Sequence, residues 1–144
     1  MTISADEAAA TPLTTDEAIA ERVQMLIGRA IRRTWWLLFL DDDDRQLPLM
    51  MPVDDYPLVP DAVSADGSAD FVRSAMEGVG ARHVIFVWER PVGAGITGPD
   101  RAWASLLADG CRERGLSVRA QLISHRQGVR WLAPDDYAEH SVAS

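Results

Sequence analysis

The spacing of apolar residues along the chain predicts a series of helices and strands within one domain. Apolar positions repeat at helical spacing in three segments, at residues 14–33, 68–79 and 97–115. Runs that are apolar on both faces, or that alternate apolar and polar residues, predict strands at residues 35–40, 46–53, 83–88, 118–122 and 129–132. The resulting order is α-β-β-α-β-α-β-β. It is typical of an α/β fold with a mixed central sheet flanked by helices.

Local signals indicate how these elements begin and which strand lies at an edge. Thr14 or Thr15 is placed to cap the first helix, and Thr97 is placed to cap the last one. Pro48 and Pro52 predict that strand 46–53 is an edge or bulged strand, because proline has no N–H for the sheet. Strand 118–122 is expected to be half-exposed. The side chains expected to face inward from the later helices are Phe71, Val72, Ala75, Met76, Val79, Trp103, Leu106, Leu107 and Cys111.

Composition and charge then narrow the class of protein. The chain has 144 residues, of which 47% are hydrophobic and 25% charged, as expected for one globular domain. Its net charge of −8 makes nucleic acid an unlikely partner, because proteins that bind phosphates normally present a basic face. All 14 basic residues are arginine, which is typical of a GC-rich, bacterial genome.

The cysteine content and the absence of long apolar runs indicate the cellular compartment of the protein. Cys111 is the single cysteine, so the chain has no internal disulfide, and we expect a buried structural thiol. The first residues lack a signal-peptide pattern, and no apolar run approaches the roughly 20 residues of a membrane span. The sequence therefore predicts a cytoplasmic protein with no membrane partner.

The element order and several motifs resemble the RadC-like branch of the JAB/MPN family, over about residues 21–133. In that family an apolar strand ends in Leu-Asp, as at Leu40-Asp41 here. A later strand ends in His-x-His-Pro-x-Gly, and Ser-x-x-Asp begins the next helix. The matching stretches are 88–93 and 97–100, which share Pro91, Gly93 and Asp100 with the pattern.

This resemblance implies a division of the chain and a type of fold. It places a RadC/JAB-like domain at residues 14–134, between a disordered tail of residues 1–13 and a C-terminal tail of residues 135–144. The implied architecture is a single domain of the JAB/MPN (cytidine deaminase-like) type.

The chain departs from the family at the zinc ligands. The resemblance implies two histidines and an aspartate that hold zinc, whose bound water attacks an amide carbonyl. Trp88 and Arg90 stand at the two histidine positions, and neither an indole nor a guanidinium can ligate a metal. Asp100 alone does not hold zinc. Strand 46–53 offers no glutamate as a base, and Asp54 and Asp55 lie just beyond it. We therefore expect no metal, no cofactor and no catalytic residue.

Two other segments suggest weaker alternatives. The acidic run 41–44, with Asp54 and Asp55, could hold a divalent cation, but it lacks the spacing of a calcium loop and a solvated turn is favoured. The glycine-rich segment 90–98 could cradle a phosphate with its N–H groups, although the known phosphate motifs are absent.

The three histidines are scattered along the sequence. Structural or surface roles are favoured for His83, His125 and His140, and His125 is the strongest of them as a site residue.

The residues that remain form one candidate binding cleft, which would suit a carboxylate or phosphate better than a metal. Its members are Trp88, Glu89, Arg90, Thr97, Asp100, Arg101 and His125. Trp103 could flank the cleft as a platform, but a place in the core is favoured for it.

The leading hypothesis is a non-catalytic binding or protein-interaction module. The alternatives are a hydrolase with a rebuilt site around Arg90 and Asp100, joined by Glu89, and an accessory protein in DNA transactions, as the resemblance to RadC implies. The edge strand at residues 46–53 makes a homodimer plausible.

Overall fold

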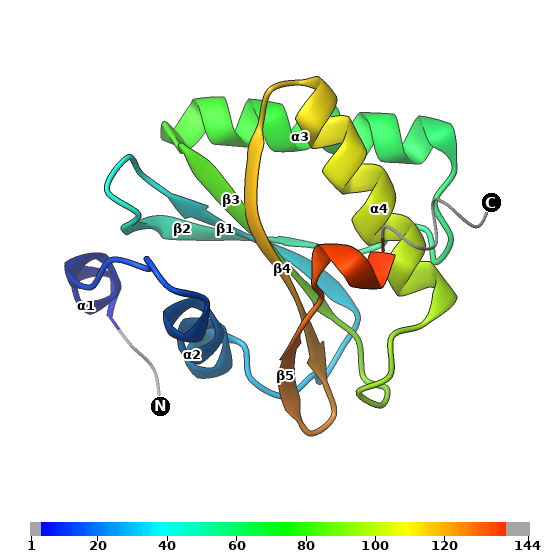
Figure 1. Ribbon diagram of the computed structural model, residues 1–144, viewed down its shortest axis with the longest axis horizontal. Coiled ribbons are helices and arrows are strands. Elements are labelled where there is room, and N and C mark those ends of the chain that lie inside the picture. The colour runs from blue at the N-terminus through cyan, green and yellow to red at the C-terminus, as the bar shows by residue number, and fades with distance from the viewer. Residues whose placement is uncertain (1–3, 138–144) are drawn as a thin grey trace.

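The computed structural model describes residues 4–137 as three layers, with one sheet between helices (Figure 1). The helices are α1 (Ala5–Ala10), α2 (Asp16–Leu26), α3 (Ala62–Val79) and α4 (Gly98–Glu113). The strands are β1 (Thr34–Leu40), β2 (Gln46–Val53), β3 (His83–Glu89), β4 (Ser117–His125) and β5 (Gly128–Trp131). The α/β class and the mixed sheet are therefore confirmed. No helix in the described residues is long and apolar enough to span a membrane.

The sheet has five strands in the order β2-β1-β3-β4-β5. Strand β1 is antiparallel to β2 and β3, strands β3 and β4 are parallel, and β5 returns antiparallel to β4. Thr34 pairs with Glu89, which pairs in turn with Ser124 on β4. The start of β1 and the ends of β3 and β4 therefore meet at one end of the sheet.

Alternation along the strands divides the core between the two faces of the sheet. Leu37 and Phe39 point to the face that α3 and α4 cover, and Leu38 and Leu40 point to the face that α2 covers. All four side chains are fully buried. This double burial explains why β1 reads as a continuous apolar run.

Two helices have ends that differ from the prediction. Helix α2 stops at Leu26 instead of near residue 33, and Gly28 then turns the chain in the left-handed region with φ 65°. Helix α3 begins at Ala62 instead of residue 68, so the connection after strand 46–53 is shorter than the predicted helix start implies. Its start is a capping box in which Asp61 accepts from the Ser64 N–H and the Ser64 hydroxyl accepts from the Asp61 N–H.

Some predicted burial is also wrong. Phe71 on α3 is 43% exposed and Leu106 on α4 is 37% exposed, although both were expected to face inward. Strand β4 is buried from Ala120 to His125 instead of half-exposed. The reason is that its two faces contribute to both cores, with Ile123 on one side and Leu122 on the other.

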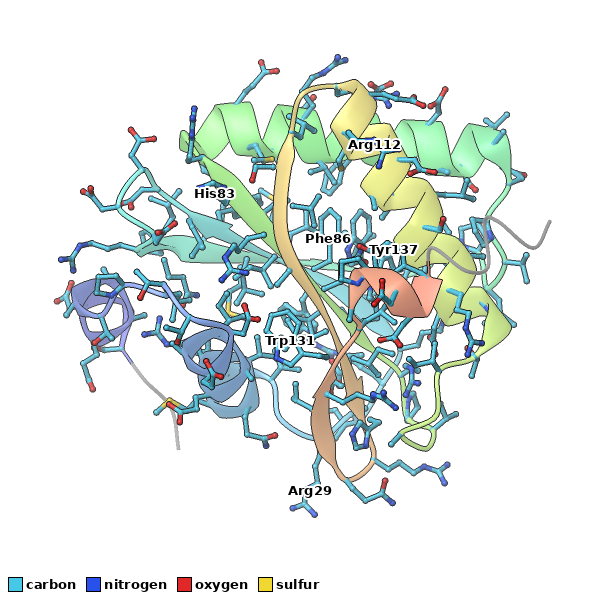
Figure 2. All side chains as sticks on the ribbon, in the orientation of Figure 1. Arg29, His83, Phe86, Arg112, Trp131 and Tyr137 are labelled. Carbon is cyan, nitrogen blue, oxygen red and sulfur yellow. The ribbon has the colours of Figure 1, made fainter. Side chains whose placement is uncertain are left out.

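The segments predicted as tails contact the domain where the structure describes them. Helix α1 lies within residues 1–13, and Leu13 is 1% exposed with its N–H bonded to the Asp44 carbonyl. The buried Arg22 donates to the Ala8 carbonyl. Tyr137 packs against the core (Figure 2), so the folded unit reaches at least that residue. Residues 138–144, including His140, lie outside the described part of the chain.

Strand β2 is the edge strand that its two prolines predict. It pairs with β1 alone, and Pro48 and Pro52 are both exposed. Helix α1 runs beside it (Figure 1), and Arg45 after the β1–β2 turn donates to the carbonyls of Ala9 and Ala10.

Candidate functional site

A buried ion pair joins the end of β3 to the start of α4. The Arg90 guanidinium meets the Asp100 carboxylate through Nε, 3.2 Å from Oδ1, and through Nη2, 2.9 Å from Oδ2. Their side chains are only 9% and 10% exposed. Two parallel contacts of this kind form the fork that arginine and carboxylate prefer. The pair therefore fixes both side chains in position.

Asp100 also belongs to the cap of α4. Thr97 is the N-cap, and its hydroxyl oxygen accepts from the Asp100 N–H while the Asp100 carboxylate accepts from the Thr97 N–H. The predicted cap is thus confirmed. A carboxylate in the first turn is further stabilised by the positive end of the helix dipole.

The loop between β3 and α4 directs its carbonyl groups at arginine side chains. Every carbonyl from residue 91 to residue 96 accepts a hydrogen bond. The donors are the side chains of Arg90, Arg101, Arg126 and Arg130 and the N–H of Arg126. Arg90 itself donates to the carbonyls of Gly93 and Gly95. These contacts do not support the phosphate-cradle alternative, because the carbonyl groups of this loop face cationic side chains.

A cavity of about 400 Å³ lies beside this ion pair. Its floor contains Trp88 and Trp103, which are 3% and 2% exposed. Both indole N–H groups are already used, by the Gln121 side chain and the Pro57 carbonyl. The floor is therefore an apolar surface, and the expectation that Trp103 belongs to the core is confirmed.

One wall of the cavity comes from the segment after β2. Tyr56 lines it, and the guanidinium of Arg33 lies 3.6 Å over the centre of the Tyr56 ring. Arg33 also donates to the carbonyls of Tyr56 and Pro57, so it holds this segment against the domain. Leu58 and Val92 form exposed apolar parts of the rim.

The Tyr56 hydroxyl stays protonated in this environment. Burial raises its pKa to about 12, opposed by the nearby charge of Arg33. A neutral phenol can donate a hydrogen bond. Neither Arg33 nor Tyr56 was predicted from the sequence, because Arg33 immediately precedes β1, Tyr56 follows β2, and nothing in their spacing links them.

The structure brings together part of the predicted cleft. Trp88, Arg90, Thr97 and Asp100 all line the cavity, whereas Glu89, Arg101 and His125 do not. Glu89 points to the opposite face of the sheet, as alternation along β3 requires. Its carboxylate there accepts from the Ile31 N–H and the Trp36 indole. His125 is buried and accepts from the Gln127 N–H.

The predicted acidic cluster shows no sign of a metal site. Within residues 4–137, no three carboxylate, histidine or cysteine side chains are placed to hold a metal ion. Asp41 accepts from the N–H groups of Asp43 and Arg45, as in a capped turn. Asp54 accepts from the Thr34 hydroxyl.

A second cavity, of about 610 Å³, lies at the opposite end of β3. His83 and Ser117 line it, and the Ser117 hydroxyl is 2.6 Å from the His83 Nδ1. Helices α3 and α4 both end there, at Gly80 and Gly115. Their negative dipole ends would oppose an oxyanion, so this serine–histidine contact is poorly placed for acyl transfer.

No family model matches this chain, and the search of curated proteins likewise finds no match. The family resemblance therefore depends on the residues of the chain itself.

Proposed function

We propose that this chain is a RadC-like JAB/MPN domain without catalytic activity, which works as a binding module in a bacterial cytoplasm. The observation that supports this most is the cavity beside the Arg90–Asp100 pair. Trp88, Arg90 and Asp100, which stand at the metal-ligand positions of the resemblance, all line this one cavity.

In this proposal the guanidinium of Arg90 takes the position of the metal ion that the resemblance implies. It holds the loop of residues 91–96 through the carbonyls of Gly93 and Gly95, and it neutralises Asp100. A second cation beside it would be repelled, and both carboxylate oxygens of Asp100 already accept hydrogen bonds. The arginine thus performs the structural task of a metal and leaves no activated water.

The geometry does not favour the hydrolase alternative. A rebuilt site would need an acid and a base within reach of one substrate atom. The carboxylates of Glu89 and Asp100 face opposite sides of the sheet and have separate partners. The cavity has instead the size and apolar lining of a small-molecule binding site.

Metal analysis tests the proposal directly. Protein purified without a metal-chelate step should contain zinc far below one equivalent, before and after dialysis against a zinc salt. Asp100→Asn should leave that result unchanged. Stoichiometric zinc in the natural protein that is lost in Asp100→Asn would overturn the proposal.

A further inference from the structure

The two arginines that line the cavity differ in their partners, and this difference indicates the kind of ligand. Asp100 is neutralised by Arg90, whereas Arg33 has no ion pair within residues 4–137. We propose that the cavity binds a small apolar carboxylic acid, with its carboxylate on Arg33 and Tyr56. This inference rests on the proposed binding function and names the ligand class of the same site.

Arg33 keeps donors free for such a ligand. A guanidinium has five N–H donors, and the hydrogen bonds to Tyr56 and Pro57 use only part of them. The side chain is held in place by those bonds and by the Tyr56 ring, so a ligand would not need to order it. A planar, fixed guanidinium is the preferred protein group for a carboxylate.

The Tyr56 hydroxyl is the second donor. Tyr56 lines the cavity, and its hydroxyl has no hydrogen bond to another residue in the described part of the chain. A phenol is protonated at neutral pH, so the hydroxyl can donate and adds no negative charge. It can therefore share the carboxylate with Arg33.

The rest of the cavity suits an apolar body. Trp88 and Trp103 form a floor whose polar atoms have partners inside the protein. Leu58 and Val92 are exposed at the rim and would be partly covered by a bound ligand. Burial of such a ligand would remove apolar surface from water without leaving a polar group unpaired.

The loop beside the cavity is contacted by three further arginines, although the whole chain carries a net charge of −8. Arg101, Arg126 and Arg130 surround the adjoining loop, and none of them has an ion pair within residues 4–137. A local excess of one sign of charge at a cavity raises the local concentration of oppositely charged ligand.

A small acid is favoured over a nucleic acid for this end of the molecule. These arginines donate to carbonyls of the loop, so part of their hydrogen-bonding capacity is used internally. The indoles of Trp88 and Trp103 are too buried to stack on bases of a single strand.

A matched pair of probes tests the inference. We would titrate 4-phenylbutyrate and 4-phenylbutanamide into the full chain by ligand-observed NMR and calorimetry. The acid should bind roughly tenfold more tightly than the amide, because a charge-assisted hydrogen bond replaces a neutral one. In Arg33→Gln and Tyr56→Phe the affinities for the acid and the amide should become nearly equal. Arg112→Gln should keep the tenfold difference.

Arg112→Gln is the matched control. Arg112 lies near the end of α4 (Figure 2), whereas the cavity is lined by residues at the start of that helix. Within residues 4–137 its ion pair is with Asp109, so Arg112→Gln makes the same charge change away from the cavity. Equal affinity for acid and amide would overturn the ligand class and leave the binding function standing. Binding of neither probe, together with stoichiometric zinc, would overturn the binding function itself. Binding of a short oligothymidylate but of neither probe would also overturn the ligand class, in favour of a nucleic acid. Unfolding midpoints of each variant would show that it is folded.

Discussion

Arg90 and Asp100 form a two-point contact that closes the loop between β3 and α4, with Arg90 Nη2 2.9 Å from Asp100 Oδ2. Both side chains are nearly buried, and Asp100 is at the same time part of the helix cap. The contact therefore links the sheet, the loop and the helix, and it forms part of the cavity wall. Its loss should affect stability and binding together.

The first prediction concerns this pair. Asp100→Asn keeps the shape of the side chain but leaves the Arg90 guanidinium buried without a counter-charge. We expect a loss of about 3 kcal/mol in the free energy of unfolding. Urea denaturation with tryptophan fluorescence measures it. Asp109→Asn is the matched control, because its partner Arg112 is 73% exposed, and it should cost less than about 1 kcal/mol. Similar losses in the two variants would show that burial of the pair contributes nothing.

The second prediction concerns the crossing of α3 and α4. A Cβ added at Gly110 would lie 3.0 Å from the Cβ of Ala69, so Gly110→Ala should destabilise the protein by about 1–2 kcal/mol. Gly67→Ala meets no atom within 4 Å and should stabilise α3 by roughly 0.5–1 kcal/mol. Thermal unfolding compares the two variants. An increase in the thermal unfolding midpoint of both variants would refute the close packing of the two helices.

The third prediction concerns pH. The folded-state pKa of Tyr56 is about 12, above its ordinary value of 10, because burial disfavours the phenolate. The stability linked to this group is complete below pH 10 and falls as pH rises toward 12. At about 1.4 kcal/mol per pKa unit, the full loss should approach about 3 kcal/mol, of which roughly 2 kcal/mol should be reached by pH 11.5.

Tyr56→Phe provides the comparison for that measurement. Urea unfolding between pH 9 and 11.5 should show a shallower decline for Tyr56→Phe than for the natural chain. Tyr137 and Cys111, whose pKa values burial also raises, are present in both proteins and contribute equally. Parallel declines would mean that the Tyr56 hydroxyl is as well solvated in the folded protein as in the unfolded one.

The fourth prediction concerns the single thiol. Cys111 is fully buried on α4, and burial raises its pKa to about 11, so it should react very slowly with Ellman's reagent at pH 8. Ser74→Cys places a second thiol on the exposed side of α3 and should add one fast-reacting equivalent. In denaturant both thiols should react. Rapid labelling of the natural chain would indicate frequent opening of α4.

Sequence patterns predicted the elements best where one local signal dominated. Strand β2 has the predicted bounds, and Thr97 caps α4 as its hydroxyl and the following proline indicate. The start of α3 was missed because Gly67 suggests a loop, whereas the Asp61 capping box and burial of Ala65 stabilise the extra turns. Tertiary contacts overrode the local propensity.

The candidate site was also predicted only in part, namely where a local sequence pattern places its residues. Trp88 and Arg90, at the end of β3 and just after it, both line the cavity, and the cap of α4 brings Asp100 beside them, so sequence spacing was sufficient. Alternation along the same strand could have excluded Glu89. The contribution of Arg33 and Tyr56 depends on how the segment before β1 packs against the segment after β2. The spacing of apolar residues does not predict such packing.

The prolines of β2 have a consequence for how copies of this protein behave at high concentration. A strand at the border of a sheet can be extended by a strand of another molecule, which is the first step of domain exchange and of fibril growth. Pro48 and Pro52 remove two of the backbone donors that such an extension would use. Addition of a strand from another copy of the chain is thereby hindered at this edge of the sheet.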